Sequence, residues 1–366
     1  MTRTRISRRV GISAAIAAAP IAAAWRFAHA YRVRAGYPRR RPPILCPADV
    51  GLPYEDLTVP SGDRELPAWW IPARDGAPGP AVVLVHGWES ARDGSLPNAQ
   101  VLHAAGFHVL AFDVRAHGEN PAEPLPLTAG EFGADALAAV RVALAMPEAT
   151  RVAVVGHSMG AAGALLAAAA EPRLAAVVAV SGPADPYRLT RQTFHIAQLP
   201  IPDPIAYPLA WLTTRIFLAP RGHKVAEISA TRAIAQYRGP ILLVHGDADV
   251  VVPPSHLDRL ARAARRSRAG MPNPAPVETL VIEGGHHSWL YELPLYRATI
   301  ARFLATALGG PLEPDEAAAV AAAVPATRLP SAEVPFTAMD DVPGGIRTLI
   351  RAIRHSGRPP APADIV

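Results

Sequence analysis

Six continuous apolar segments, separated by segments with helical spacing, constrain the fold of this chain more than any other feature of its sequence. The apolar segments are rich in β-branched residues and do not alternate with polar ones, which is the pattern of parallel strands buried on both faces. They are residues 81–87, 107–114, 151–157, 174–182, 241–247 and 277–285. Alternation of strands with helices predicts an α/β domain built on a mostly parallel sheet. Ahead of them, residues 54–73 have the pattern of a β-hairpin with Ser-Gly-Asp at its turn.

The alternation stops between residues 183 and 238. This stretch is rich in proline and aromatic residues and shows no obvious strand. A plain long connection is one interpretation, but loops of this length usually carry function. We therefore expect an insertion that covers the top of the sheet as a helical lid.

The positive charge of the chain is confined to its N-terminal segment. Residues 1–48 contain ten arginines and no acidic residue, whereas the whole chain has 36 Lys and Arg, 31 Asp and Glu, and a net charge of +5. The remaining residues thus hold 26 basic and 31 acidic side chains, a net charge of about −5. No RNA-recognition, helix-turn-helix or zinc-finger pattern is present in the sequence. Both observations argue against a nucleic-acid-binding protein.

The same N-terminal segment has the pattern of a targeting or anchoring element. The basic residues 1–9 precede a run of 16 uncharged, mostly apolar residues, 10–25. A signal-peptide core has about 7–15 residues and a membrane-spanning helix about 17–25, so this run falls between the two. An uncleaved membrane anchor, export with cleavage near Ala-His-Ala at 28–30, and a helix loosely associated with a membrane all remain open. The Pro- and Arg-rich residues 37–53 have the composition of a linker.

The sequence predicts neither a metal nor a cofactor. Cys46 is the single cysteine, which excludes an intrachain disulfide and any cysteine-rich metal site. The spacing of His103, His108 and His117 matches no known set of metal ligands. Neither a Gly-rich phosphate loop nor a G-x-G-x-x-G fingerprint occurs in the sequence.

The pentapeptide Gly156-His157-Ser158-Met159-Gly160 lies between a predicted buried strand and a predicted helix. It matches G-x-S-x-G, in which the serine occupies a strained turn and its Oγ projects above the sheet. Glycine is required two residues before and after the serine, because side chains there would clash with each other and with neighbouring strands. The partial positive charge at the N-terminus of the following helix favours a developing oxyanion. The alternative is a serine in an ordinary tight turn, but the strand-to-helix context favours a nucleophile.

A serine hydroxyl is a poor nucleophile until a base removes its proton. Asp247 and Asp249 follow one predicted strand, and His286 and His287 follow the next. Carboxyl ends of parallel strands open on one edge of a sheet, where ligands bind in such folds. These two loops are therefore expected to lie near Ser158.

From about Tyr54 to Leu308 the chain resembles the α/β-hydrolase superfamily, and most closely its serine-esterase, prolyl-oligopeptidase-like or serine-aminopeptidase-like hydrolases. The resemblance rests on five motifs in the family's order, in which the nucleophile precedes the acid and the acid precedes the histidine. The motifs are LVHGWES, FDVRAHG, GHSMG, HGDADVVVP and GGHHSWLY. The N-terminal segment also resembles that of membrane-anchored bacterial hydrolases. The resemblance implies the α/β-hydrolase fold: a mostly parallel central sheet flanked by helices, with a helical lid insertion.

The resemblance also chooses between the paired candidates. The family's H-G-x-x-D pattern selects Asp249 as the acid, and leaves Asp247 to stabilise its turn. Alignment of EGGHHSW with the family's G-x-G-H-S pattern puts His287 in the catalytic place. His286 is then a neighbour that contacts the substrate or the loop backbone.

In relatives the oxyanion is held by two backbone N–H groups, which correspond here to Trp88 and Met159. His86 is expected to hold its loop rather than to take part in the chemistry. Asp113 and Arg115 resemble a pair that stabilises the FDVRAHG loop.

These assignments predict a serine hydrolase that cleaves a carboxylic ester. Ser158 would attack the carbonyl, His287 would move the proton and Asp249 would orient His287. The alternatives are a peptidase or amidase of the serine-aminopeptidase type, an acyltransferase, and a membrane-anchored binding protein without activity. The aromatic residues of the expected lid either contact an apolar acyl or alcohol group or pack the lid onto the core. They are Phe194, Tyr207, Trp211 and Phe217.

We expect the chain to be organised in three parts. Residues 1–48 form an N-terminal signal or anchor helix with its linker, and associate the protein with a membrane. Residues 49–310 form the hydrolase domain, with the lid at 183–238, and act on a small ester or a short acyl or peptide substrate. Residues 311–366 form an Ala- and Pro-rich, partly disordered tail with a helical pattern at 315–324.

Overall fold

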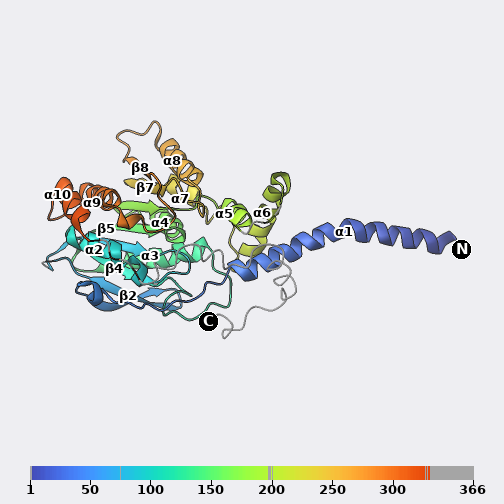
Figure 1. The fold of residues 1–366 in the computed structure, drawn as a ribbon, viewed down its shortest axis with the longest axis horizontal. Helices are drawn as coiled ribbons and strands as arrows, with labels where there is room; N and C mark the ends of the chain where they lie inside the picture. The colour runs from blue at the N-terminus through green and yellow to red at the C-terminus, as the bar shows by residue number, and fades with distance from the viewer. Residues whose placement is uncertain are drawn as a thin grey trace.

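The computed structural model of the protein describes residues 2–74, 76–196, 199, 201–325, 327 and 329. Within them, eight strands form one sheet in the order β1-β2-β4-β3-β5-β6-β7-β8 (Figure 1). The strands are β1 (Glu55–Ser61), β2 (Arg64–Ile71), β3 (Gly79–Val85), β4 (His108–Phe112), β5 (Ala149–His157), β6 (Ala176–Val180), β7 (Ile241–Gly246) and β8 (Val277–Ile282). The pairs β1–β2 and β2–β4 are antiparallel, and all other neighbouring pairs are parallel. The predicted hairpin, the six predicted strands and the mostly parallel sheet are therefore confirmed.

Helices cover both faces of the sheet, because alternate side chains of each strand point to opposite sides. Val83 of β3 and Val154 of β5 point to one face, and Leu84 and Val155 point to the other. The helices on the first face are α3 (Ala129–Ala145), α4 (Met159–Ala170), α7 (Ala230–Gln236) and α8 (Ser255–Arg268). Those on the second face are α2 (Leu96–Ala104), α9 (Pro294–Leu308) and α10 (Pro314–Ala323). Short 3-10 turns complete the regular structure: η1 (Pro47–Val50), η2 (Arg92–Ser95), η3 (Ala219–Arg221) and η4 (Leu290–Glu292).

Between β6 and β7 the chain forms α5 (Pro186–Ile196) and α6 (Asp203–Leu218), followed by η3 and α7. The described residues of this segment contain no strand, as the sequence predicted. Helix α7 packs on α4 and α8 within the helical layer, so only α5 and α6 stand apart from the layers. These two helices lie at one end of the molecule (Figure 1).

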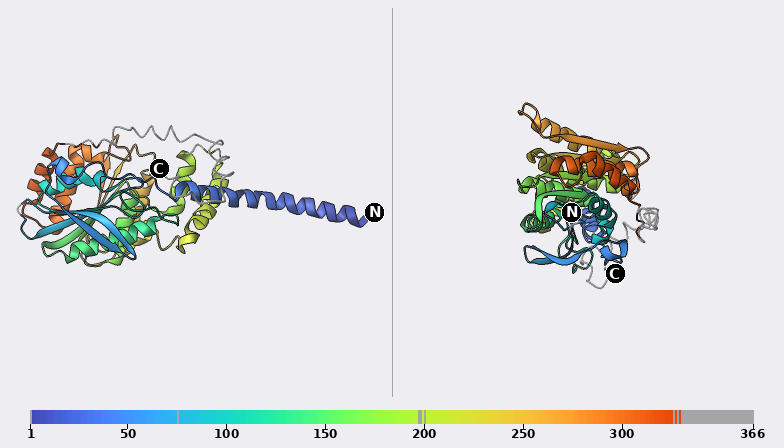
Figure 2. Two further views of the ribbon diagram at one scale, coloured as in Figure 1. Left: turned by 90° about the horizontal axis from the view of Figure 1, so that it is seen from below. Right: turned by 90° about the vertical axis from the view of Figure 1, so that its left-hand side faces the viewer.

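Helix α1 (Thr2–Ala35) leaves the body at the same end as α5 and α6 and projects away from it (Figure 2). Its last turns pack on those two helices. Phe27 of α1, Phe194 of α5 and Ala210 of α6 form a small buried core. The Thr193 hydroxyl donates a hydrogen bond to the Tyr31 oxygen at 2.9 Å, which joins α1 to α5. The N-terminal helix is thus attached to α5 and α6, the helices of the predicted lid.

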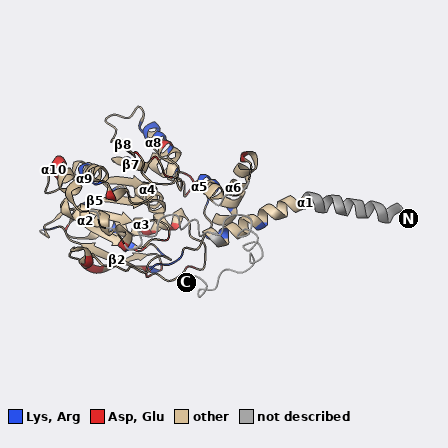
Figure 3. Cartoon of the chain, viewed as in Figure 1, with Lys and Arg blue, Asp and Glu red and all other residues tan. Residues whose placement is uncertain are grey.

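Among the described residues, no helix, including α1, combines the length and the apolar composition needed to cross a bilayer. The transmembrane helix suggested by the sequence is therefore not supported. The physical reason is that the uncharged run of α1, residues 10–25, is shorter than the about 17–25 residues that a spanning helix needs. Figure 3 shows arginines, in blue, on the part of α1 between this run and the body.

Helix α10 lies beyond residue 310, where we expected the domain to end. It packs on α9 and buries Ala317 and Ala321 against the sheet-facing core. The helical pattern predicted at 315–324 corresponds to this helix. Residues 331–366, most of the predicted tail, lie outside the described residues.

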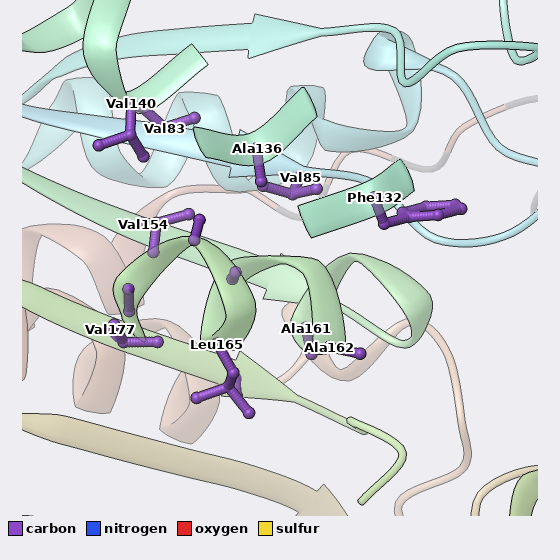
Figure 4. Packing of buried hydrophobic residues seen from close by; sticks show 14 of the residues in the cluster. Val83, Val85, Phe132, Ala136, Val140, Val154, Ala161, Ala162, Leu165 and Val177 are labelled. Atoms are coloured by element: carbon purple, nitrogen blue, oxygen red, sulfur yellow. The ribbon is translucent and has the colours of Figure 1, made fainter. Parts of the chain in front are cut away.

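The α3–α4 layer holds the strand that carries the candidate nucleophile. Phe132, Ala136 and Val140 on α3 and Leu165 on α4 pack beside the valines of the central strands (Figure 4). The two helices approach closely because Gly163 has no side chain; a Cβ atom there would lie 2.8 Å from the Phe132 carbonyl oxygen. This dense packing fixes the position of α4 and, with it, the turn that precedes α4.

Candidate active site

Ser158 occupies the sharp turn between β5 and α4. Its backbone has φ 54° and ψ −119°, a conformation that a non-glycine residue adopts at a cost of about 1–3 kcal/mol. The Ser158 N–H donates to the Val180 carbonyl oxygen of β6 at 2.9 Å, which fixes the turn to the neighbouring strand. The strained turn predicted from the pentapeptide is therefore present.

Two glycines make this turn sterically possible. A Cβ atom on Gly156 would overlap the carbonyl oxygen of Gly160. A Cβ atom on Gly160 would overlap the carbonyl oxygens of Val85 and His86 on the adjacent strand end. The clash argument made from the sequence is confirmed for both positions.

We expect Gly160→Ala to lower the free energy of unfolding by at least about 3 kcal/mol, because the methyl group meets backbone atoms that cannot rotate away. Urea denaturation followed by circular dichroism measures the change. Gly79→Ala is a matched control, because a Cβ atom there would have its nearest neighbour, His108 Nε2, at 3.7 Å. Equal unfolding midpoints for the two variants would show that the turn does not require glycine.

The structure brings the three predicted residues Ser158, Asp249 and His287 together. The Ser158 hydroxyl donates to His287 Nε2 at 2.9 Å, and His287 Nδ1–H donates to Asp249 Oδ2 at 2.8 Å. Asp249 follows β7 and His287 follows β8, so both come from loops at the carboxyl edge of the sheet. None of the three residues is more than 9% exposed. The arrangement can pass a proton from the serine to an oriented imidazole.

Asp249 is held as a carboxylate. Burial raises the pKa of Asp249, but hydrogen bonds from His245 and His287 outweigh burial, and the net pKa lies below the usual value. Its second oxygen, Oδ1, accepts the N–H groups of Val251 at 2.9 Å and Val252 at 2.8 Å. An ionised Asp249 fixes the proton of the His287 imidazole on Nδ1, which leaves Nε2 free to accept the serine proton.

The other residue of each predicted pair, Asp247 or His286, is not part of this hydrogen-bonded group. Asp247 is exposed, and its carboxylate accepts the Gly284 N–H at 2.8 Å, which stabilises the turn between the β7 and β8 loops. His286 is exposed, whereas His287 is buried. The geometry thus separates Asp249 from Asp247 and His287 from His286 in the way that the motif alignment predicted.

The sequence model of the alpha/beta hydrolase family matches residues 82–298, which is more than half of the chain and includes the elbow and both downstream loops. The chain belongs to the alpha/beta hydrolase family. An uncharacterized protein of Mycobacterium tuberculosis, present in two strains, is 29% identical to this hydrolase over 225 residues. The match covers 61% of this chain and 71% of the mycobacterial protein.

Solved structures of the same fold include an esterase and two peptidases. The Pyrococcus furiosus esterase Pf2001 is 25% identical with a TM-score of 0.56, covering 74% of this chain and 100% of the esterase. A Mycobacterium tuberculosis puromycin-hydrolyzing peptidase is 21% identical with a TM-score of 0.55, covering 70% of this chain and 40% of the peptidase. A Pyrococcus horikoshii acylaminoacyl peptidase is 17% identical with a TM-score of 0.54, covering 72% of this chain and 43% of the peptidase. At these identities the two peptidases show the fold alone.

Two histidines that the sequence did not assign support the three site residues of this alpha/beta hydrolase. His157 Nε2–H donates to the His287 carbonyl oxygen at 2.8 Å. Burial, and then the nearby His287, lower the pKa of His157 to about 4, so its ring is neutral at pH 7. His245 Nε2 lies 2.6 Å from the Val252 carbonyl oxygen and 3.2 Å from Asp249 Oδ2. Both histidines stand inside the quoted motifs, but a motif does not tell where a ring points.

The predicted oxyanion donors come from the two segments that flank Ser158. Met159 is the first residue of α4, and the first N–H groups of a helix have no partner within the helix. Trp88 follows Gly87 in the loop after β3, and a Cβ atom on Gly87 would lie 3.3 Å from Ser158 Cβ. The loop that carries Trp88 therefore passes beside the serine. The role of the two amides stays a prediction.

His86 holds the loop after β3, as expected from the sequence. Its Nδ1–H donates to the Gly87 carbonyl oxygen at 2.8 Å, and its Nε2 accepts the Val114 N–H at 3.0 Å. Burial lowers the pKa of His86 to about 4, so the ring is neutral and can accept and donate one bond each.

The expected pairing of Asp113 with Arg115 is wrong. Asp113 forms its ion pair with Arg92, and Arg115 forms its ion pair with Asp135. Arg92 reaches the FDVRAHG loop from η2, and Arg115 of the loop reaches Asp135 on α3. Contacts with other elements therefore replace the expected local pair.

The sequence predicted no metal or cofactor ligands. In the described part of the chain, no group of three or more His, Cys, Asp or Glu side chains is placed to hold a metal ion. His108, one of the three histidines considered as ligands, is engaged on both ring nitrogens. Its Nδ1 accepts the Ala73 N–H and its Nε2–H donates to the Ala77 carbonyl oxygen, each at 3.0 Å.

Proposed function

We propose that this alpha/beta hydrolase is a serine hydrolase that cleaves carboxylic esters through a covalent acyl-enzyme. The proposal rests on one observation above all. A continuous hydrogen-bonded line runs from Asp249 Oδ2 through the His287 ring to Ser158 Oγ, with distances of 2.8 and 2.9 Å. The line ends on a serine held in a strained turn at the start of a helix.

In the first half-reaction, Ser158 Oγ attacks the ester carbonyl carbon while its proton passes to His287 Nε2. Asp249 stabilises the imidazolium that forms. The carbonyl oxygen becomes an oxyanion, which the N–H groups of Met159 and Trp88 would hold. Collapse of this intermediate breaks the bond to the alcohol, and the alcohol leaves with the proton from His287.

In the second half-reaction, water attacks the acyl-enzyme carbonyl and gives one proton to His287 Nε2. The tetrahedral intermediate then expels Ser158 Oγ, which takes this proton back, and the carboxylic acid is released. An alcohol in place of water would give acyl transfer by the same steps. A peptide bond could enter the same cycle, with an amine as the leaving group.

An ester is favoured over a peptide by the comparison with solved structures. The likeness covers the whole of the Pyrococcus furiosus esterase chain, but less than half of each of the two peptidases. The shared part of the peptidases is the fold and not the remainder of those chains. We therefore place ester hydrolysis first, peptidase or amidase activity second and acyl transfer third.

The full chain is expected to hydrolyse p-nitrophenyl acetate and butyrate with a kcat/KM at least about 100-fold above that for alanine p-nitroanilide, because an amide carbonyl is less electrophilic than an ester carbonyl and its amine is a poorer leaving group. This ratio corresponds to about 2.7 kcal/mol of transition-state free energy. Release of the nitrophenolate or nitroaniline chromophore measures both reactions. An anilide cleaved as well as the esters would support the peptidase alternative instead. Product analysis in the presence of added methanol or glycerol separates hydrolysis from acyl transfer, which would give the new ester as the main product.

We also propose that the N-terminal helix associates the protein with a membrane. The ten arginines of residues 1–48, without any acidic residue, suit an anionic lipid surface. Ile21 and Trp25, one turn apart on α1, are exposed apolar side chains. A basic helix with exposed apolar residues is typical of segments that bind at a lipid interface.

A further inference from the structure

The side chains of α6 are distributed in the opposite way from that expected in water. Its outward face carries large rings: Tyr207 is 44% exposed and Trp211 is 51% exposed. Apart from Leu218 at its C-terminal end, its buried side chains are small or polar: Ala206, Ala210, Thr213 and Thr214, none of them more than 2% exposed. A helix on the surface of a water-soluble protein normally buries its largest apolar residues and exposes its polar ones. The outward face of α6 is therefore suited to a less polar neighbour than water.

The outward residues form one continuous stripe. They occur at the spacing i, i+3, i+4, i+7 and i+11, which keeps them on one side of a helix. They are Pro204, Tyr207, Pro208, Trp211 and Arg215, all exposed. We call these five residues the α6 stripe.

Arginines lie against the two rings of the stripe. The Arg191 guanidinium is 4.3 Å from the centre of the Tyr207 ring, and the Arg215 guanidinium is 4.7 Å from the Trp211 ring. Helix α6 itself has only two charged residues, Asp203 and Arg215, and appears mostly uncharged beside the arginines of α5 (Figure 3). Tryptophan and tyrosine next to arginine is the composition of protein surfaces at the lipid headgroup level.

The orientation of α1 points to the same neighbour. Helix α1 projects from the end of the molecule that carries α5 and α6, as two perpendicular views show (Figures 1 and 2). The ring of Phe27 on α1 packs edge-on against Phe194 of α5, with ring centres 5.3 Å apart. A lipid surface that binds α1 beside the body would therefore lie close to α6.

We propose that the α6 stripe is a second lipid-binding surface, which docks the lid end of the protein on an anionic phospholipid bilayer. The rings of Tyr207 and Trp211 enter the headgroup region, and Arg215 binds a lipid phosphate beside Trp211, whereas Arg191 keeps its ion pair with Asp203. Charge favours a bilayer over a protein partner, because α1, which projects from this end of the molecule, belongs to a segment (residues 1–48) that contains ten arginines and no acidic residue.

Docking at this place would bring the lipid surface close to the candidate site. The Gln192 side chain on α5 donates to the Val250 carbonyl oxygen at 2.6 Å, and Val250 follows the candidate acid Asp249 directly. The lid helices are thus tied to the acid loop. If the proposed ester hydrolysis is correct, its substrate could reach the serine from the lipid phase.

The test compares vesicle binding of the full chain with that of the double variant Tyr207→Ser/Trp211→Ser. Cosedimentation with vesicles of phosphatidylcholine containing phosphatidylglycerol gives the dissociation constant. We expect the double variant to bind at least about tenfold more weakly, the loss that corresponds to removing about 1.4 kcal/mol of interfacial contact. Wild-type binding is expected to weaken on pure phosphatidylcholine, because the arginines lose their anionic partners.

The matched control is Val281→Ser/Leu295→Ser. These apolar residues are 52% and 57% exposed and belong to β8 and α9 rather than to α1, α5 or α6. The control should bind as the wild type does, and circular dichroism with thermal melting checks that both double variants remain folded. Ser158→Ala should also bind as the wild type does, so a failure of the catalytic proposal would not be mistaken for a failure of docking.

Equal binding of the wild type and the Tyr207→Ser/Trp211→Ser variant would overturn the proposal, because α1 would then account for all of the affinity. Sedimentation velocity without lipid gives a second way to overturn it. A wild-type dimer that the same two substitutions convert to a monomer would assign the α6 stripe to a second copy of the chain.

Discussion

Ser158→Ala is expected to lower kcat for p-nitrophenyl butyrate by about 10⁴- to 10⁶-fold, because the reaction loses its nucleophile and retains only binding and oxyanion contacts. The same substitution should abolish labelling by an active-site fluorophosphonate, which reacts with an activated serine. Mass spectrometry of the labelled wild type should place the adduct on the peptide that contains Ser158. Steady-state kinetics and labelling together measure the loss.

Ser181→Ala is the matched control for this variant. Ser181 follows β6, is buried, and also has a positive φ, 51°, so it resembles Ser158 in place and backbone but has no histidine partner among the contacts of the described residues. Its substitution should leave kcat within about threefold of the wild type. If Ser158→Ala still turned over esters, or were still labelled, the hydrolase would need a different nucleophile.

His287→Ala should lower kcat by about 10³- to 10⁵-fold, whereas His286→Ala should change it by less than about threefold. The difference follows from the geometry. His287 accepts the Ser158 hydroxyl at 2.9 Å and is buried, while the adjacent His286 is exposed to solvent. Kinetics with p-nitrophenyl butyrate under identical conditions measures both variants.

The two histidine variants control each other, because they make the same chemical change at neighbouring positions of one loop. Loss of turnover in His286→Ala but not in His287→Ala would reverse the assignment. Loss in both would indicate that the loop conformation, rather than one ring, determines the rate, and thermal melting would then distinguish unfolding from a local change.

Much of the fold could be predicted because its central strands are buried on both faces. Burial on both sides leaves continuous β-branched runs such as 151–157, and these mark strands without any information from distant residues. The elbow was predictable for a similar reason. The clash at Gly156 is with the turn itself and the clash at Gly160 is with the adjacent strand end, but both constrain the same five consecutive residues, which can be recognised in the sequence.

Contacts between distant segments could not be predicted in the same way. Arg92 pairs with Asp113 and Arg115 pairs with Asp135, and neither pairing has a periodic or local pattern in the sequence. The same holds for His245, whose ring reaches the acid only because the loop after β7 folds back. The choice of Asp249 over Asp247 and of His287 over His286 came from the family motifs. Spacing alone does not show which side chain of each pair packs beside the serine.

The attachment of α1 to the lid links the fate of the N-terminus to the shape of the enzyme. Phe27 and Tyr31 both pack against Phe194, at ring distances of 5.3 and 5.9 Å. Proteolytic removal of residues 1–30 would take away Phe27 and leave one face of Phe194 open to water. A chain cut there would therefore differ from the full chain in the packing of α5 and α6, and not only in its N-terminal segment.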